Sequence, residues 1–397
     1  MSRAHIVTDG SEALAVASEL ATEFRKGAAE RDAGRRLPHS EVDRLSASGL
    51  LAVTVPAEHG GADVGAGTLA EVFRLLAAAD ASLAQIPQNH FVYVNVLRAQ
   101  GTAAQREFLF REVLAGKRFG NAQSEAGTRH VLDIRTRLDP APDGGGSYRL
   151  TGVKNYCTGA LFADWIPVLA RAADDRLHVA YVPRDAPGVT VVDDWDGMGQ
   201  RTTASGTVRL DGVSVPADRV VPHHLTFEGP QLHGAFGQLL HAAIDAGIAS
   251  GALAEAVDFV RTKSRPWFES GFESAADDPL LVQRFGELAI RVRAAEALLA
   301  EAARAVDTAR AGLTDASAAE ASIAVAAAKV TAADAAVEMG SALFEVSGTR
   351  SALDGLGLHR HWRDARTHTL HDPGRWKVQH IGRYVLNGTR PPRHGLL

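Results

Sequence analysis

The stretch LVQRFGELAIRVRAAEALLAEAARAVDTARA, residues 281–311, has the pattern of a long amphipathic helix. Its apolar residues recur in alternating steps of four and three, which places one apolar stripe on a long helix that faces partner helices in a near-antiparallel bundle. The next segment repeats this pattern, and Gly348 supplies a C-terminal stop. The first stripe comprises Leu281, Phe285, Leu288, Val292, Ala295, Leu299, Ala302, Val306 and Ala309, and the second comprises Ile323, Ala326, Val330, Ala333, Val337, Gly340 and Phe344.

The chain changes character twice on the N-terminal side of this bundle. Short β-rich runs occur between Arg118 and Pro222, among them YRLTGVKNY (148–156) and GTVRLDGVSV (206–215), and PAPDGGGS (140–147) is typical of a hairpin connection. On the N-terminal side of these runs, between Ser11 and Gly116, apolar residues again recur at helical spacing. We predict a mainly α chain with an N-terminal helical domain (1–117), a middle β-barrel domain (118–226) and a C-terminal four-helix bundle (227–397).

Composition limits the classes of function. The 397 residues are 46% apolar and carry a net charge of -5, with acids and bases interspersed, so neither nucleic acid nor an anionic membrane surface is an expected partner. Cys157 is the single cysteine, which excludes an internal disulfide or a multi-thiolate metal site and favours the cytoplasm. The first twenty residues lack the apolar core of a signal peptide, and no apolar stretch is long enough to span a bilayer.

Motifs for common cofactors are missing from the sequence. No GxGxxG follows a strand and no GxxxxGK[ST] occurs, so neither a dinucleotide fold nor a P-loop is supported. The 16 histidines include no HExxH and no set at metal-ligand spacing, so we expect no metal site. A small organic molecule is the expected partner.

Four stretches contain residues that could bind such a molecule. In GNAQSEAGTRHVLDIRTRL (120–138), Asn121 and Ser124 could hydrogen-bond a polar heterocycle, although a plain connecting loop explains the composition equally well. In TGVKNYCTGALFADW (151–165), Tyr156 is followed by Thr158 and Gly159, whose hydroxyl group and backbone could closely approach a ligand. The cations of VRTKSRPW (260–267), and Arg350 in SGTRSALDG (347–355), could hold a phosphate or merely complement a helix end.

Several separated motifs, in this order, resemble one family. GNAQSE, GVKNYCTGALFADW, DDWDGMGQRTTASGTV, RTKSRPW and WRDARTHTLHDPGRWKVQHIGRYVLNG, together with the three-part order, resemble the acyl-CoA dehydrogenase fold. Within that fold they are similar to the dibenzothiophene monooxygenase branch of reduced-flavin-dependent two-component monooxygenases. Where a dehydrogenase has its catalytic glutamate, this chain reads Leu370, His371, Asp372 and Pro373. An imidazole fits oxygen chemistry better than removal of a thioester α-proton, with Asp372 left open as a displaced base.

The resemblance implies an activity and its partners. Reduced FMN from a separate NAD(P)H:flavin reductase would react with O2, and the resulting flavin C4a-hydroperoxide would oxygenate a sulfur or nitrogen heteroatom of a small substrate. A homotetramer is implied. An FAD-dependent acyl-CoA dehydrogenase or oxidase is the alternative, and a catalytically inactive flavin-binding scaffold is a third hypothesis.

The resemblance also assigns roles to particular residues. His371, His90, Asn121 and Thr158 would be catalytic, with His368 nearby. The flavin ring would lie against Asn121, Gln123, Ser124 and Thr158, with Trp195 as a wall of the cavity. Arg265, and Arg350 with Ser351 from a neighbouring subunit, would hold the FMN phosphate.

Overall fold

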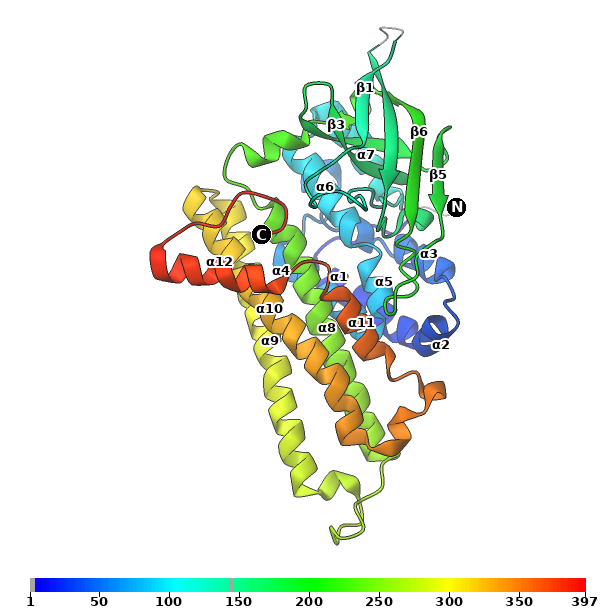
Figure 1. Ribbon diagram of the computed structural model, residues 1–397, viewed down its shortest axis with the longest axis vertical. Coiled ribbons are helices and arrows are strands. Elements are labelled where there is room, and N and C mark those ends of the chain that lie inside the picture. Colours follow the sequence, from blue (N-terminus) through cyan, green and yellow to red (C-terminus); the bar gives the residue numbers. More distant parts are fainter. Residues whose placement is uncertain (1–3, 143–145) are drawn as a thin grey trace.

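The N-terminal part of the computed structural model, which describes residues 4–142 and 146–397, is helical (Figure 1). Local capping sets several helix boundaries: the Asp9 side chain accepts from the Glu12 amide, and Thr102 and Gln105 form a capping box. Asp80 both ends one helix and caps the next. The helices are α1 (Gly10–Arg25), α2 (Ala28–Ala33), α3 (His39–Ala47), α4 (Ala66–Ala79), α5 (Ala81–Gln85), α6 (Gln88–Gln100) and α7 (Ala103–Leu114).

The described residues of the middle part form one seven-stranded sheet in the order β5-β6-β2-β1-β3-β4-β7. All neighbours pair antiparallel except β1 and β3. The strands are β1 (Arg137–Pro140), β2 (Ser147–Lys154), β3 (Trp165–Ala172), β4 (Leu177–Pro183), β5 (Val189–Val192), β6 (Thr207–Pro216) and β7 (Val220–Val221).

The predicted middle β domain is confirmed, with one difference in its closure. In the described part of the chain, β5 and β7 each pair on one side only, so the strands form a sheet with two edges where a closed barrel was predicted. Pro140 lies opposite Tyr148, as the predicted hairpin requires, although residues 143–145 of its connection lie outside the described residues.

A C-terminal four-helix bundle was predicted, and the C-terminal domain is helical, with three long helices and two shorter ones among the described residues. In α9 the predicted stripe is buried from Leu288 to Ala309, while Leu281 and Phe285 are partly buried. The helices are α8 (His233–Thr262), α9 (Pro279–Ala311), α10 (Asp315–Ser347), α11 (Arg360–His368) and α12 (Gly374–Asn387). Short 3-10 helices lie at Leu50–Ala52, Ala57–His59, Ala160–Phe162, Ala217–Arg219, His223–Phe227, Ala275–Asp277, Thr349–Ala352 and Asp354–Leu356.

Helix α10 differs from its prediction in the side that it buries. Val330, Val337 and Phe344 of the predicted stripe are only half-buried, whereas Val325 and Met339 are among the residues that face the core. Helix α10 packs against both α8 and α9, so more than one stripe is covered. Its alanine-rich sequence has apolar residues on several faces, which makes the period ambiguous. Gly348 ends the helix with a φ of 74°, as predicted.

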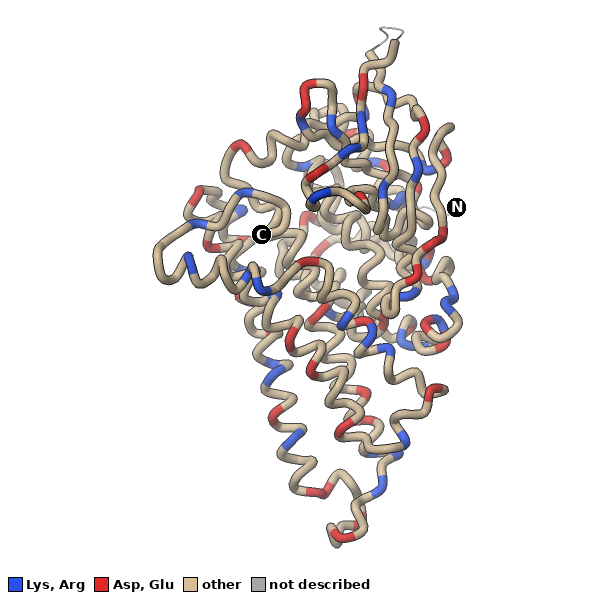
Figure 2. The backbone as a smooth tube through the Cα atoms, viewed as in Figure 1, with Lys and Arg blue, Asp and Glu red and all other residues tan. Residues whose placement is uncertain are grey.

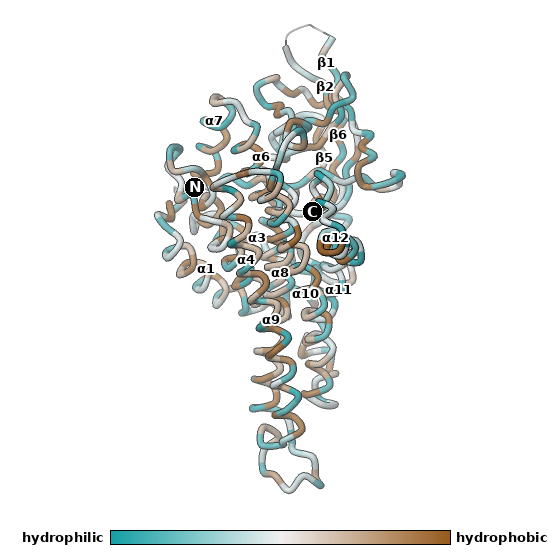
Figure 3. The backbone as a smooth tube through the Cα atoms, turned by 90° about the vertical axis from the view of Figure 1, so that its left-hand side faces the viewer, coloured by the Kyte–Doolittle hydropathy of each residue, from teal (hydrophilic) through white to brown (hydrophobic). Residues whose placement is uncertain are grey.

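The largest hydrophobic core joins the N-terminal and C-terminal helices. It takes residues from α1, α4, α8, α9 and α10, and hydrophobic residues are prominent where α4, α8 and α9 pack together (Figure 3). Charges of both signs are interspersed along the chain (Figure 2). Among the described residues, no helix combines the length and hydrophobicity that a membrane crossing needs. The domain limits after residues 117 and 226 stay predictions.

Candidate active site

Asn121 and Thr158, two of the residues predicted to contact the flavin ring, lie close together beside the sheet. The Asn121 amide donates to the Tyr156 carbonyl at 3.3 Å and accepts from the Tyr93 hydroxyl at 3.4 Å. Both Asn121 and Thr158 are buried. The long distances leave the Asn121 amide able to make a stronger hydrogen bond to a bound molecule.

A chain of hydroxyl groups fixes the proton of Thr158. Thr203 donates to the Gln200 carbonyl at 3.0 Å, and Ser205 lies 2.7 Å from both Thr203 and Thr158. Because a carbonyl only accepts and each hydroxyl has one proton, Ser205 must donate to Thr203, and Thr158 must donate to Ser205. Thr158 therefore presents lone pairs, which suit a ligand N–H.

Two aromatic rings stand next to this pair. Tyr156 is exposed and has a φ of 58°, an unfavourable conformation for a bulky residue that is often found at functional sites. Its ring meets the half-buried Trp195 edge to face at 6.4 Å, and the Trp195 indole donates to the Gln200 carbonyl at 2.9 Å. A flat polar heterocycle fits a site with such rings and hydrogen-bonding groups.

Gln123 and Ser124 contribute backbone contacts that hold the same loop. The Ser124 carbonyl accepts from the Asn155 amide at 2.9 Å, and the Gln123 carbonyl accepts from the Lys154 ammonium at 3.1 Å. Lys154 is fully buried and also pairs with Glu125 at 2.7 Å. This ion pair anchors the loop to β2.

A second group of side chains lies between α8, α10 and α11 and was only partly predicted. His368 donates from Nδ1 to Asp245 at 2.5 Å, and its Nε2 lies 3.0 Å from Nδ1 of His241. The Lys329 ammonium pairs with the other Asp245 oxygen at 2.6 Å. All four side chains are buried. Sequence analysis predicted His368 and missed the other three, although His241 and Asp245 stand four residues apart on a strongly apolar helix.

His371 lies against this group, in the turn between α11 and α12. Its ring centroid is 4.1 Å from that of His241, with an interplanar angle of 38°. As a whole residue His371 is exposed, although its ring packs against that of His241. Burial lowers its pKa, and Lys329 and Lys377 act in the same direction, while Asp372 opposes them. The lowered pKa favours the neutral imidazole of His371 at pH 7.

The carboxylate next to His371 is held in an ion pair. Asp372 is buried, and its Oδ2 lies 2.7 Å from the Lys377 ammonium. Burial would raise the pKa of Asp372, but the charges of Lys377 and Lys329 outweigh it and lower the pKa. A carboxylate with a lowered pKa is a poor base, so the displaced-base alternative left open by the sequence is disfavoured.

His90 was predicted to be catalytic, but its contacts indicate a structural role. Its Nε2 donates to the Leu51 carbonyl at 2.8 Å, and its Nδ1 accepts from the Phe119 amide at 3.0 Å. The ring is buried, and burial lowers its pKa to about 4. Both ring nitrogens are thus committed to the backbone, and His90 ties the N-terminal helices to the start of the β domain.

One loop connects the two groups of site residues. The segment Trp195–Ser205 carries Trp195, Gln200 and Ser205, and the Gln200 amide donates to Asp364 of α11 at 2.5 Å. Asp364 lies one helical turn before His368. The hydroxyl network around Thr158 and the histidines of α11 are therefore held by the same loop.

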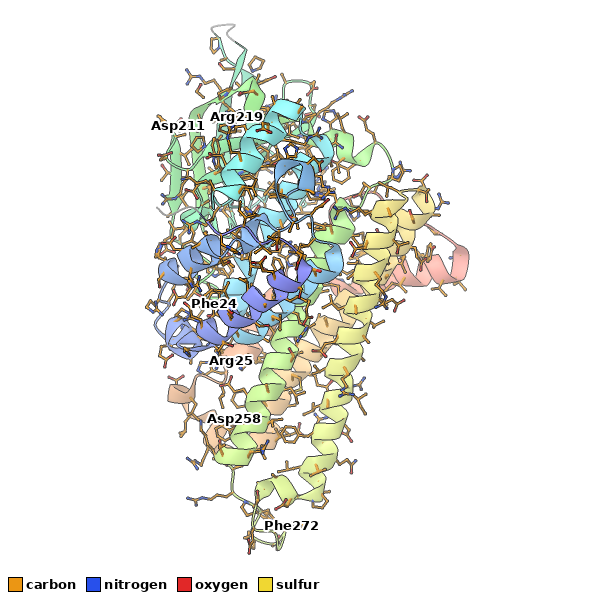
Figure 4. All side chains as sticks on the ribbon, turned by 180° about the vertical axis from the view of Figure 1, so that it is seen from behind. Phe24, Arg25, Asp211, Arg219, Asp258 and Phe272 are labelled. Carbon is orange, nitrogen blue, oxygen red and sulfur yellow. The ribbon has the colours of Figure 1, made fainter. Side chains whose placement is uncertain are left out.

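The cations predicted to hold a phosphate lie far from both groups of site residues, at the distal end of the long helices. Helix α8 places its end at Thr262 about 30 Å beyond His241, at roughly 1.5 Å per residue. Arg265 follows this end and is exposed, and Arg350 donates to the Lys263 carbonyl at 3.0 Å. In Figure 4, Asp258 and Phe272 mark this region, opposite Asp211 and Arg219 of the β domain. Within one chain, these arginines therefore lie about 30 Å from His241, at the far end of the long helices.

Ser351, the third predicted phosphate contact, lies at the same distal end. It is buried, and its hydroxyl donates to the Gly348 carbonyl at 2.6 Å. Among the described residues, no three His, Cys, Asp or Glu side chains are placed to hold a metal ion.

Family models cover most of the chain and define its class. The acyl-CoA dehydrogenase N-terminal domain matches residues 13–117, the middle domain matches residues 120–213, and the C-terminal domain matches residues 239–373. The fold is therefore that of the acyl-CoA dehydrogenases.

Individual relatives narrow this class. Dibenzothiophene monooxygenase of Rhodococcus erythropolis is 36% identical, with 96% of this chain and 94% of that protein covered. A probable FMNH2-dependent monooxygenase of Pseudomonas putida, SfnC, is 33% identical, with 98% of each chain covered. FMN-bound TdsC from Paenibacillus sp. A11-2 has a TM-score of 0.92 at 35% identity, covering 97% of this chain and 100% of that one, and another crystal structure of TdsC contains FMN and indole. The chain belongs to the flavin monooxygenases of the acyl-CoA dehydrogenase fold, in the family of dibenzothiophene monooxygenase, which confirms the predicted family.

Proposed function

We propose that this protein uses reduced FMN, supplied by a separate NAD(P)H:flavin reductase, and O2 to place one oxygen atom on a sulfur or nitrogen atom of a small organic substrate. The observation that carries this proposal is the turn between α11 and α12. There, by the resemblance of the sequence, the imidazole of His371 would stand where a dehydrogenase has its base, and the adjacent Asp372 is paired with Lys377 at 2.7 Å. The FAD-dependent acyl-CoA dehydrogenase alternative lacks a free carboxylate at this place.

The residues beside the sheet fit the cofactor. Asn121 and Thr158 offer hydrogen-bonding groups to a flavin ring, Trp195 provides a wall, and the loop of Gln123 and Ser124 is fixed by the Lys154–Glu125 pair. Thr158, which can only accept, would receive a ring N–H, a group that reduced flavin has at N5. Reduced FMN supplies two electrons and activates O2, while the protein orients the ring and excludes water.

His371 and the phosphate contacts complete the proposal. A neutral imidazole can accept or donate a hydrogen bond, so His371 would steady the oxygen that is transferred. Arg265, Arg350 and Ser351 would hold the FMN phosphate of a neighbouring subunit in a homotetramer, because in their own chain they lie at the far end of the long helices. Arginine suits this purpose through its bidentate geometry.

The relatives and a pocket beside the turn support the proposed substrate class. Relatives carry the names of enzymes for dibenzothiophene, an aromatic sulfide, and TdsC has been crystallised with indole. A cavity of about 300 Å³ lies next to Asp372, with Pro373, Trp376, Lys377 and Leu396 among its lining residues. Such a volume suits a small, largely apolar molecule.

The test supplies enzymatically reduced FMN and air to the purified protein with aryl sulfides, dialkyl sulfides, indoles and amines. Mass spectrometry should detect products that have gained one oxygen atom, and omission of the reductase should abolish them. Anaerobic mixing with acyl-CoA esters tests the alternative. Flavin bleaching by an ester without added reductant, or the absence of oxygenated product from every probe, would overturn the proposal.

A further inference from the structure

A hydrogen-bonded chain of buried side chains leads from α10 to the turn that carries His371. Lys329 of α10 contacts Asp245 of α8, Asp245 contacts His368 of α11, and His368 contacts His241 of α8. The three contacts measure 2.6, 2.5 and 3.0 Å. The ring of His241 then lies against that of His371.

The spacing of residues on α8 builds this chain. His241 and Asp245 stand four residues apart, so they share one face of the helix and lie one above the other. His368 projects from α11 between them, with one ring nitrogen on each. The hydrogen bond from His368 to Asp245 would be enough to join α11 to α8. The second contact, between His368 and His241, is therefore not explained by helix packing.

The chemistry of the groups fixes where the protons lie. A carboxylate paired with an ammonium group only accepts, so His368 carries a proton on Nδ1. One further proton is shared between Nε2 of His368 and Nδ1 of His241. In the neutral form that proton belongs to His241, whose Nε2 then has a free lone pair.

A proton added at Nε2 of His241 changes this arrangement without moving heavy atoms. The shared proton passes to Nε2 of His368, and the positive charge then lies on His368 next to the Asp245 carboxylate. The reverse transfer returns the shared proton to Nδ1 of His241 while Nε2 of His241 releases its proton to an acceptor at the site. Each N–H bond that breaks is matched by one that forms, and one proton is taken from solvent to recharge the chain.

We propose that Asp245, His368 and His241 form a proton relay that stores one proton beside His371 and exchanges it with the reacting atoms. Oxygen transfer from reduced flavin ends in the release of water, so protons must be held and moved within a site that excludes solvent. Asp245 and His368 are positioning residues, because they act through His241. Lys329 keeps Asp245 ionised and so keeps it an acceptor. This inference rests on the proposed function.

The charged groups around the relay come from every element packed against it. They are Lys329 on α10, Lys377 on α12, and His371 with Asp372 in the turn. Burial lowers the pKa of His241 well below its ordinary value, and the neighbouring histidines and both lysines act in the same direction. A charge on His241 is therefore disfavoured, and transfer of the proton to His368, beside the Asp245 carboxylate, is favoured.

The chain offers a matched control on the same two helices. His361 of α11 contacts Glu255 of α8 at 2.5 Å, so it forms a second histidine–carboxylate pair between these helices, with a buried imidazole and a half-buried carboxylate. This pair has no contact with His241 or His371 among the described residues. His361→Gln therefore removes a comparable packing contact and leaves the relay intact.

The first arm of the test is kinetic. Asp245→Asn, and the double variant Asp245→Asn with Lys329→Met, which leaves no unpaired buried charge, are compared with wild type and His361→Gln in single turnovers with pre-reduced FMN and an aryl sulfide. We expect the rate of product formation to fall at least about tenfold near pH 8 in the relay variants, and less near pH 6, where solvent supplies protons. His361→Gln should keep the wild-type pH profile. A wild-type profile in the relay variants, or the same change in His361→Gln, would overturn the proposal.

The second arm needs neither flavin nor activity. Nitrogen-15 spectra of histidine-labelled protein should show a proton on Nδ1 of both His241 and His368, and a nitrogen–nitrogen hydrogen bond between the two rings, in wild type and in His361→Gln, and loss of this pattern in the double variant. Identical spectra in wild type and the double variant would contradict the relay. If wild type oxygenates no probe, the proposed function fails, and this arm still decides whether the relay exists.

Discussion

Replacement of His90 by Gln separates a structural role from a catalytic one. A Gln side chain can still donate to the Leu51 carbonyl, but the Phe119 amide loses its acceptor. A buried amide left without a partner costs about 1–3 kcal/mol. We therefore expect the free energy of unfolding to fall by that amount near pH 7.5.

The pH dependence of this loss gives a sharper test. Burial holds the pKa of His90 at about 4 in the folded protein, against 6.5 when unfolded, so the unfolded chain binds the extra proton between these values. The neutral ring therefore stabilises the fold fully above pH 6.5, and this stabilisation is lost as the pH falls towards 4. Between about pH 7.5 and 5 the loss amounts to about 2 kcal/mol. His90→Gln lacks this dependence, so the two stability curves should converge at acid pH.

Urea denaturation followed by circular dichroism at several pH values measures both effects. His130→Gln, at an exposed histidine, is the control and should parallel wild type. Parallel curves for wild type and His90→Gln would refute the reasoning. So would a fully stable His90→Gln variant that binds FMN and has lost oxygen transfer, because that outcome would restore the catalytic role predicted from the sequence.

Three further predictions follow from the site. His371→Ala should bind FMN nearly as well as wild type but lose at least about 100-fold in product formation, and full product yield would contradict its role. Burial, with the Asp32 carboxylate next in importance, raises the pKa of Asp364 from 3.8 to about 7, so the folded state keeps a proton that the unfolded state has lost, and stability falls as the pH rises between these values. Asp364→Asn should remove this slope, at most about 4 kcal/mol, as measured by denaturation, and an unchanged slope would refute the assignment. Arg350→Ala should weaken FMN binding at least about tenfold in fluorescence titrations if a neighbouring subunit supplies the phosphate contact, and unchanged affinity would exclude that contact.

Local spacing predicted the helices well, with one instructive failure. The stripe of α9 is buried from Leu288 to Ala309 because its apolar residues recur at helical spacing, although Val282 and Ile290 of the same helix are exposed. Helix α10 has alanine on several faces, so its sequence fits more than one stripe, and its neighbours decide which residues are covered. Val330 and Phe344 were assigned to the core for this reason, and both are half-buried.

Contacts between distant residues were beyond local reasoning. His90 meets partners 39 and 29 residues away, and His241 meets His368 across 127 residues. The resemblance brought His368 and His371 to notice because they stand in a recognisable motif. Asp245 and Lys329 occur in plain alanine-rich helices, and only the packing of α8 against α10 and α11 reveals them.

The loop Trp195–Ser205 has a practical consequence for redesign. Gln200 uses its carbonyl to hold Trp195 and Thr203 and its amide to hold Asp364. A library that varies this loop to admit bulkier molecules would also disturb α11 and the orientation of its histidines. Changes in selectivity made here should therefore come with losses in turnover, and compensating mutations should be sought on α11 in the same round.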